Sequence, residues 1–340
     1  MADTIRIGII GAGSVAQARH IPRLQKVPGV QITHAWSQSL ETSQTASRKF
    51  GIPTIVGNWE AIIESPEIDA VVIATPPILH LPTTLAALNG GKHVLCQARM
   101  ARNLREARIM LEASTATNLV TALYPPLAGL KGDWAMRRLL HDECYVGTIQ
   151  DVRVTDITQT VPTAPSWRMD PEVVGVNTMS MGIVAEVFNR WVGPAKSISV
   201  SSSEPPTAVP QSLAIGATLG GGGTASFHLS SRVTHGAGSS MEIFGSRGVL
   251  HYKFSADEIS GMTENEDKMH SIEISPDEHR SQTTDAEFIE AIRKGTPVVP
   301  NFEEGLQYME FNEAVAQSLY DVKTVPMPPN PKMQTWGTLL

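Results

Sequence analysis

Cysteine and basic residues are both scarce in this chain of 340 residues. Its two cysteines, Cys96 and Cys144, form neither a disulfide framework nor a closely spaced metal-binding pair. Lys and Arg number 27 against 34 Asp and Glu, and the formal net charge of −7 disfavours nucleic acid or an anionic membrane as a partner. No apolar run reaches transmembrane length, and the first residues lack a signal-peptide pattern. We therefore expect a cytoplasmic protein with no bound metal and a small-molecule substrate.

A glycine-containing motif follows the first apolar run. Residues 5–10 are typical of a buried parallel strand, and the next six have the pattern G-x-G-x-x-A at the start of an expected helix. Gly11 permits a tight turn, Gly13 leaves room for a pyrophosphate, and Ala16 lets the helix pack closely against the strand. The first helical turn also offers N–H groups to phosphate. The motif predicts that a dinucleotide is bound by Gly11, Gly13, Ser14, Val15 and Ala16.

The end of the second expected strand, residues 30–36, bears on the choice of cofactor. NAD-binding folds place an acidic residue there, and it accepts hydrogen bonds from the ribose 2′-hydroxyl. This chain has Ser37 and Gln38 instead, and its next acid, Glu41, belongs to the following turn or helix. A hydroxyl does not repel a 2′-phosphate, although no arginine follows directly to bind one. We expect Ser37 and Gln38 to contact NADP, with NAD as the alternative.

Strand and helix patterns alternate through the first 124 residues. Further strands are expected at 70–74, 92–96 and 119–124, and helices at 43–50, 59–64, 80–89 and 104–117. This alternation predicts a doubly wound parallel sheet, which binds ligands at the carboxyl ends of its strands. We therefore predict an α/β Rossmann domain over residues 1–124, with the nicotinamide near Gln97.

Short strands follow one another in the second half of the chain. They are expected at 145–158, 197–202, 213–219, 224–230, 241–244 and 250–253. Such a run predicts an open, mostly antiparallel sheet. Helices are expected at 175–193, 285–293 and 306–320, the last two packing back on the first domain. We predict that residues 125–340 form an α+β domain for substrate binding and oligomerisation.

Several segments together carry a resemblance to a known family. They are residues 11–16, 74–80, 91–96, 241–248, 285–296 and 303–306. In these segments and their order the chain resembles the glucose–fructose oxidoreductase, inositol dehydrogenase and rhizopine-catabolism (Gfo/Idh/MocA) family of NAD(P)-dependent oxidoreductases. The resemblance implies a homodimer or homotetramer formed through the C-terminal sheet. It also implies that the motif Thr-Pro-Pro-x-x-His lies near the cofactor, which adds Ala74, Thr75, Pro76, Pro77, His80 and Gln97 to the expected cofactor site.

The chain departs from this family where the family moves protons. The family carries Glu-Lys-Pro after the strand at 92–96, and this chain has Gln97-Ala98-Arg99. The family also places an Asp and a His one helical turn apart on the helix at the substrate cleft, and here the matching positions are Ser180 and Val184. The resemblance therefore implies that the usual Lys, Asp and His are all absent. Oxidation of an ordinary alcohol normally needs a positioned base, so simple polyols are doubtful substrates.

Two residues are candidate catalytic replacements. Arg99 could bind a carboxylate or stabilise an oxyanion, or it could be a surface cation or a contact to a cofactor phosphate. Tyr124, at a strand end, could donate a proton, although packing is the simpler role. We expect Asn177 to share a helical face with Ser180 and Val184, and Glu186 to be solvated or capping. The expected substrate-lining residues are Ala98, Trp167, Arg168, Asn177, Ser180 and Val184.

Three functions fit these residues. The favoured hypothesis is an NAD(P)-dependent oxidoreductase that transfers hydride to a small carbonyl, conjugated C=C or imine substrate, including sugar-derived compounds. Such additions need less help from a lysine than alcohol oxidation does. The second is elimination or cleavage of a sugar derivative through transient oxidation by a bound nucleotide. The third is a nucleotide-binding sensor without turnover.

Overall fold

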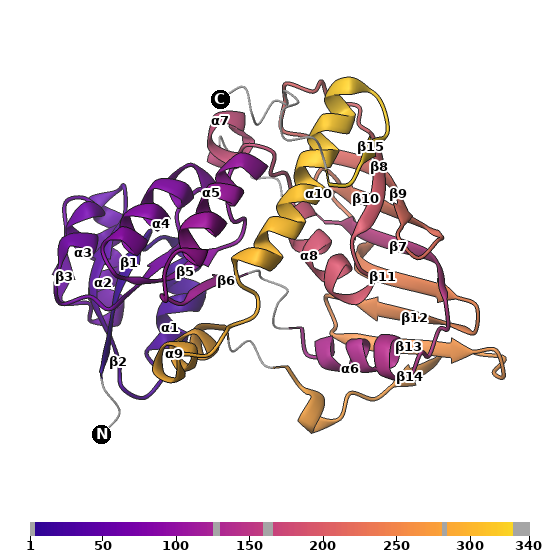
Figure 1. Ribbon diagram of the computed structural model, residues 1–340, viewed down its shortest axis with the longest axis horizontal. Helices are drawn as coiled ribbons and strands as arrows, with labels where there is room; N and C mark the ends of the chain where they lie inside the picture. Colours follow the sequence, from indigo (N-terminus) through magenta and orange to yellow (C-terminus); the bar gives the residue numbers. More distant parts are fainter. Residues whose placement is uncertain (1–3, 125–129, 159–165, 281–283, 329–340) are drawn as a thin grey trace. The chain divides into compact units, whose positions relative to one another are not determined.

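The computed structural model describes residues 4–124, 130–158, 166–280 and 284–328. It divides the chain into two compact units (Figure 1). The first unit contains residues 1–125 and 283–306, and the second contains residues 126–282 and 307–340. The predicted division at residue 124 left the segment 283–306 in the second domain, with its helix packing back on the first, whereas in the structure this segment belongs to the first unit.

A six-stranded sheet forms the centre of the first unit, with the strand order β3-β2-β1-β4-β5-β6. All its neighbouring strands run parallel, as predicted for a doubly wound sheet. Its strands are β1 (Ile5–Ile10), β2 (Val30–Trp36), β3 (Thr54–Ile55), β4 (Ala70–Ile73), β5 (His93–Gln97) and β6 (Thr121–Tyr124). Its helices are a π-helical segment (Ala16–His20), α1 (Ile21–Leu24), α2 (Leu40–Phe50), α3 (Glu60–Glu64), a 3₁₀ turn (Pro77–Leu79), α4 (His80–Asn89), α5 (Leu104–Thr115) and α9 (Thr284–Lys294).

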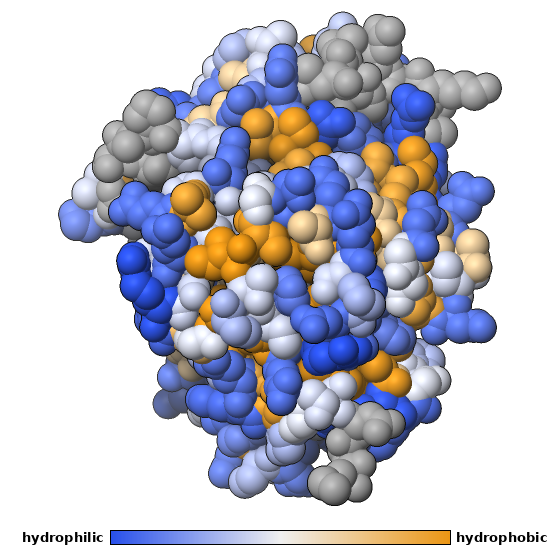
Figure 2. Space-filling view, turned by 90° about the vertical axis from the view of Figure 1, so that its left-hand side faces the viewer, coloured by the Kyte–Doolittle hydropathy of each residue, from blue (hydrophilic) through white to orange (hydrophobic). Residues whose placement is uncertain are grey.

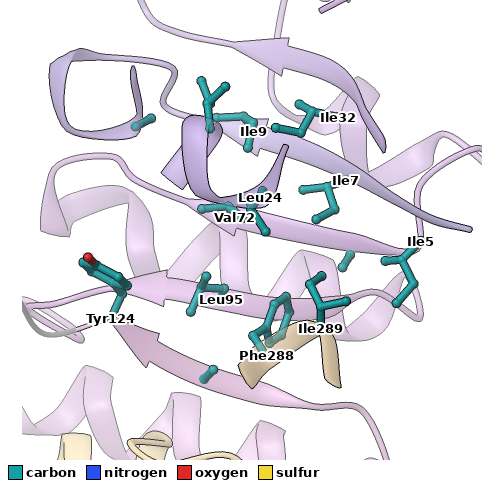
Figure 3. Packing of buried hydrophobic residues seen from close by; sticks show 14 of the residues in the cluster. Ile5, Ile7, Ile9, Leu24, Ile32, Val72, Leu95, Tyr124, Phe288 and Ile289 are labelled. Atoms are coloured by element: carbon teal, nitrogen blue, oxygen red, sulfur yellow. The ribbon is translucent and has the colours of Figure 1, made fainter. Parts of the chain in front are cut away.

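The apolar strands of this sheet are buried because helices cover both of its faces. Every residue of β4 is buried, and β1 has one half-exposed position. Figure 3 shows Phe288 and Ile289 of α9 beside Leu95 and Ile5, so the returning segment completes this core. The strand order reverses between β1 and β4, which is where such sheets bind their ligands.

A nine-stranded sheet forms the second unit, with the order β14-β13-β12-β11-β7-β10-β9-β8-β15. Only β7 and β10 pair in parallel, so the predicted open, mostly antiparallel sheet is confirmed. Its strands are β7 (Ile149–Ile157), β8 (Ala195–Ser201), β9 (Ser212–Leu219), β10 (Thr224–Ser230), β11 (Gly238–Gly245), β12 (Gly248–Lys253), β13 (Glu258–Thr263), β14 (His270–Ile272) and β15 (Val325–Pro326). Its helical segments are α6 (Asp133–Arg137), a π-helical segment (Arg138–Asp142), a 3₁₀ turn (Trp167–Met169), α7 (Pro171–Val174), α8 (Met181–Trp191), a second 3₁₀ turn (Pro276–Glu278) and α10 (Phe302–Asp321), whose first residues belong to the first unit.

One face of this sheet is covered by helices. Phe227 of β10 contacts Phe188 of α8 and Phe311 of α10, with ring centroids 5.1 and 5.2 Å apart. Buried and more exposed residues alternate along β9 and β10, as expected for a sheet with one packed face.

The helix expected at 175–193 is shorter in the structure, because α8 begins only at Met181. Gly175 has φ +62° and ends α7, and Met179 has φ +43°, so the backbone leaves the right-handed helical region twice before α8. Asn177 therefore lies outside the helix. The prediction that it shares a helical face with Ser180 and Val184 is wrong.

The side of the molecule that carries β3, α2 and α3 has a mixed surface (Figure 2). Hydrophilic residues are interspersed there with smaller apolar patches. Leu40, at the start of α2, is the most exposed large apolar residue of the described first unit, at 62%. Scattered apolar residues of this kind are normal on protein surfaces.

Candidate functional site

The predicted phosphate-binding loop connects β1 to the first helix. The N–H groups of Gly11 and Ala12 both donate to the carbonyl of Trp36, at 2.8 and 3.0 Å, which joins the ends of β1 and β2. Gly11 has φ +96°, and a Cβ there would lie 2.7 Å from the backbone of Ala74. A Cβ on Gly13 would meet no protein atom within 4 Å. The first glycine is thus required by the protein itself, while the second leaves open space beside the loop.

Two hydroxyl groups at the same sheet edge fit a bound dinucleotide. The Oγ of Ser37, after β2, and the Oγ1 of Thr75, after β4, are buried and form no hydrogen bond within the part of the chain that the structure describes. Buried polar atoms normally have a partner, and an unsatisfied one costs about 1–3 kcal/mol. A ribose or phosphate group could supply these hydrogen bonds, so the residues present fit the cofactor.

His80 connects two loops at this edge. Its Nδ1 lies 2.8 Å from the carbonyl oxygen of Arg99, and its Nε2 lies 2.8 Å from that of Thr75. Burial lowers the pKa of the His80 imidazole below its ordinary value. The side chain therefore holds the loop after β4 against the loop after β5.

The segment Gln97-Ala98-Arg99 lies at the carboxyl end of β5, as predicted. Gln97 is opposite Tyr124 in the parallel pairing of β5 with β6, and the Ala98 N–H donates to the Tyr124 carbonyl at 3.1 Å. The peptide bond between Ala98 and Arg99 is cis. All three side chains are half-buried.

Tyr124 belongs to the hydrophobic core of the first unit (Figure 3). Only 2% of the residue is exposed, Arg23 donates to its hydroxyl oxygen, and the ring of His20 packs edge-on at 4.5 Å. His20 is bonded in turn to Asp285 of α9, with Nδ1 and Oδ1 2.7 Å apart. Burial raises the pKa of the Tyr124 hydroxyl. These contacts favour the packing role of Tyr124 over proton donation.

A carboxylate lies beside Ser180 in the second unit. Ser180 precedes α8, and its Oγ donates to Oδ2 of Asp156, which is 8% exposed near the end of β7. A second hydroxyl, that of Ser239 on β11, also bonds to Asp156. Burial raises the pKa of the Asp156 carboxyl, and the two hydroxyl hydrogen bonds oppose this shift.

The other predicted substrate-lining residues of this unit have different surroundings. Asn177 is 1% exposed and donates to the Val174 carbonyl at 2.7 Å, while its Oδ1 accepts from Asn312 at 3.0 Å. Val184 is also 1% exposed. The guanidinium of Arg168 lies over the ring of Trp167, 4.4 Å from its centroid.

The carboxyl end of α8 carries a buried ionic cluster. Asp133 is fully buried and accepts from Arg190 Nε at 2.8 Å, from Trp191 Nε1 at 2.8 Å and from Arg280 at 2.7 Å. Arg190 also donates to Glu186, which is 4% exposed. The predicted solvated or capping role of Glu186 is therefore wrong, because Glu186 is buried and pairs with Arg190 at its i, i+4 position.

The sequence analysis missed Asp156, although a signal was present. Val152, Val154 and Asp156 alternate along β7 and share its buried face, so an acid occupies an apolar position. An acid on a buried strand face needs a polar partner, and that requirement could have singled it out.

Residues 5–124 match the model of the oxidoreductase family with an NAD-binding Rossmann fold, named for Gfo, Idh and MocA. Over these residues, the chain is similar to the Gfo/Idh/MocA family of oxidoreductases. Both the predicted resemblance and the predicted fold are thus confirmed.

Several named relatives are similar over part of the chain. One is 1,5-anhydro-D-fructose reductase of Ensifer adhaerens, 29% identical over 202 residues that cover 58% of this chain and 60% of that protein. Another is dTDP-3,4-didehydro-2,6-dideoxy-alpha-D-glucose 3-reductase of Streptomyces violaceoruber, 29% identical over 181 residues that cover 53% and 52%. The matched regions thus span between half and two thirds of these relatives.

Solved structures resemble the chain over almost all its length. A levoglucosan dehydrogenase in complex with NADH aligns with a TM-score of 0.83 at 20% identity, covering 96% of this chain and 100% of that one. An oxidoreductase domain protein from Kribbella flavida aligns with a TM-score of 0.85 at 22% identity, over 96% and 100%. At this identity the likeness establishes the fold.

Among the described residues, no group of three or more His, Cys, Asp or Glu side chains is arranged to hold a metal ion. Within the same ranges, every helix is too short or too polar to cross a membrane.

Proposed function

We propose that the chain is an NAD(P)-dependent oxidoreductase acting on a small carbonyl, imine or conjugated C=C compound, with sugar-derived molecules as the favoured class. The observation that carries this proposal is the open space at Gly13, together with two buried hydroxyls at the same sheet edge, those of Ser37 and Thr75, that have no partner among the described residues. Two similar relatives are named as reductases of sugar derivatives, which supports the substrate class.

The cofactor would be held by groups at the carboxyl edge of the first sheet. The backbone from Gly11 to Ala16 would bind the pyrophosphate, and Ser37 with Gln38 would contact the adenosine ribose. The loop from Ala74 to Pro77 and the side chain of Gln97 would lie along the nicotinamide half, with His80 fixing that loop. The bound nicotinamide supplies a hydride donor or acceptor.

Ser37 favours NADP because it has no negative charge to repel a 2′-phosphate. Its Oγ is buried without a protein partner, so it can donate to either a 2′-hydroxyl or a 2′-phosphate. We infer that NADP binds at least as well as NAD.

The proposed substrate contacts are taken for each unit by itself. In the first unit, Arg99 would hold a carboxylate or a developing oxyanion, next to Ala98. In the second unit, Trp167, Arg168 and Ser180 would contact substrate. Asn177 and Val184 are buried in the interior of the second unit, so they would support the site without contacting the substrate.

The oligomer is proposed to form through the second sheet. Ser199, Thr218 and His228 are exposed on β8, β9 and β10, on the face opposite the packed aromatic residues. A homodimer or homotetramer built on this face would appear in light scattering as a multiple of 36.7 kDa.

Two valine substitutions test the cofactor site. A Cβ at Gly13 or at Gly57 would meet no protein atom within 4 Å, and neither glycine has a left-handed φ. We expect Gly13→Val to abolish nucleotide binding in calorimetry because its side chain fills the space for the pyrophosphate, while Gly57→Val binds as the parent does. Undiminished affinity in Gly13→Val, or a strong preference of the parent for NAD, would contradict this assignment.

Turnover separates the competing functions. The parent with NADPH or NADH should consume reduced nicotinamide when given carbonyl, imine or enone acceptors, and should oxidise simple polyols very slowly. Elimination products formed without net consumption of nicotinamide would favour the transient-oxidation alternative. Nucleotide binding without turnover of any compound would favour the sensor.

A further inference from the structure

The serine before α8 is used differently from other residues at helix starts. Ser39 before α2 and Asn103 before α5 accept hydrogen bonds from Thr42 N and Glu106 N, as capping residues do. Ser180 has no such bond with the N–H groups of α8. Its hydroxyl donates instead to the Asp156 carboxylate.

Within the described parts of the chain, no cation pairs with Asp156. It lies between Leu229 of β10 and Ser239 of β11 in the strand register, and its hydrogen-bond donors among the described residues are the hydroxyls of Ser180 and Ser239. The influences on its pKa are burial and these two hydrogen bonds. A buried carboxylate without a positive partner is costly to keep ionised, so it holds a proton more readily than an exposed one. Groups with this property are frequent at catalytic sites.

We propose that Ser180 and Asp156 form a proton relay for the substrate oxygen, in which Ser180 Oγ contacts the substrate and Asp156 Oδ2 holds the proton. The inference rests on the proposed oxidoreductase function, which puts Ser180 in the substrate site. It assigns proton handling to a strand residue that the sequence analysis did not consider.

The protons and electrons of the relay balance in both oxidation and reduction. In oxidation, the proton of a substrate hydroxyl moves to Ser180 Oγ while the serine proton moves to Asp156 Oδ2, so one O–H bond forms for each that breaks. The carbon-bound hydrogen leaves with its electron pair as the hydride of the redox reaction. In reduction, Asp156 returns its proton through Ser180 to the product oxygen, and water protonates the carboxylate again.

Ser180 is the contacting group, and Asp156 acts through it. A hydrogen bond with only a structural role would also join β7 to the start of α8. The test must therefore include a measurement that would not respond to the loss of a purely structural hydrogen bond. The pH dependence of kcat/KM is such a measurement, because it follows the protonation of the relay.

The experiment compares isosteric changes at two aspartates of β7 in the full-length chain with its nucleotide. In Asp156→Asn, kcat is expected to fall by about 10²–10⁴-fold. The part of the kcat/KM pH profile that is due to titration of the Asp156 carboxyl is expected to disappear. Nucleotide affinity, measured by calorimetry, is expected to be unchanged. The control is Asp151→Asn, whose carboxylate is partly exposed and pairs with Arg153 at 3.4 Å. The control should keep the parent's kcat and pH profile.

A direct titration supplies evidence that does not depend on activity. Carboxyl carbon resonances of the labelled protein should show the Asp156 pKa rising further in Ser180→Ala, because that variant loses a hydrogen bond to the ionised form. An unchanged Asp156 pKa in this variant would overturn the relay, as would an Asp156→Asn enzyme that keeps kcat and the pH limb. If the parent binds nucleotide yet converts no acceptor, both the proposed function and the relay are wrong. If the parent turns over and only the Asp156 predictions fail, the relay alone is wrong.

Discussion

The two ends of α8 are each attached to a buried aspartate, and the two aspartates differ in their partners. At the carboxyl end, Asp133 accepts from two guanidinium groups and an indole N–H. At the amino end, Asp156 accepts from the hydroxyls of Ser180 and Ser239. The exposed fractions of the two residues are similarly small, 0% and 8%.

The difference in partners separates a structural carboxylate from one suited to proton transfer. Guanidinium groups are always charged, so Asp133 is compensated at every pH near neutrality. Hydroxyl groups stabilise an ionised carboxylate less, and burial raises the Asp156 pKa in spite of them. Burial alone therefore does not indicate a functional acid, and the charge of its partners has to be considered as well.

The largest expected effect is a loss of stability when the Asp133 charge is removed. Asp133→Asn removes the buried carboxylate that both Arg190 and Arg280 contact, so we expect a loss of about 3–5 kcal/mol in the free energy of unfolding. Urea denaturation measures it, and the same change at Asp156 serves as the matched control because no cation among the described residues pairs with Asp156. Equal losses in the two variants would show that the partner charges do not distinguish the two ends.

Much of the first unit was predictable because its signals are local. The motif Gly11–Ala16 and the strands ending at Trp36, Ile73 and Gln97 can each be identified within a short window, and parallel sheets with buried strands follow from apolar runs. The helix at 285–293 was expected to pack back on this unit, but that the whole segment 283–306 belongs to the unit was not predictable in the same way. It depends on α9 contacting a core whose other members lie far away along the chain.

The second unit was predicted as a class but not in its site. The left-handed φ of Met179 shortened α8, and a methionine gives no sign of that backbone conformation. Ser180 and Asp156 are separated by 24 residues, and Arg280 and Asp133 by 147. Pairs of this kind become visible only when the sheet register and the helix position are known.

A smaller effect is expected in the pH dependence of stability. Burial raises the folded Asp156 pKa above its ordinary value of 3.8, so the folded chain keeps this proton over a pH range in which the unfolded chain has lost it. The contribution of Asp156 to the unfolding free energy is therefore unaffected below pH 3.8 and falls as pH rises through the folded pKa.

The comparison with Asp156→Asn isolates that contribution. Carboxylates with lowered pKa values, such as Asp69 and Glu278, have the opposite pH dependence but are common to both proteins and cancel in the difference. The unfolding free energy of Asp156→Asn minus that of the parent should increase as pH rises. The total increase should be about 1.4 kcal/mol for each unit by which the folded Asp156 pKa is raised. Urea unfolding in buffers from acid to neutral pH gives the curve. A difference that stays constant across this range would mean that Asp156 is as well compensated as Asp133.

The smallest effect is expected from the second hydroxyl at Asp156. Ser239 lies opposite Asp156 in the register of β11 with β7, and its hydrogen bond lowers the carboxyl pKa. Ser239→Ala should therefore raise the Asp156 pKa and reduce the unfolding free energy at neutral pH by about 1 kcal/mol, the usual net worth of one hydrogen bond. Ser240→Ala is the control, since adjacent residues of a strand point to opposite faces and Ser240 faces away from Asp156. Carbon resonances of the carboxyl groups report the pKa in both variants. A shift of equal size in the two would show that the change acts through the strand rather than through the hydrogen bond, and no shift in either would mean that Ser180 alone determines how the amino end of α8 holds its proton.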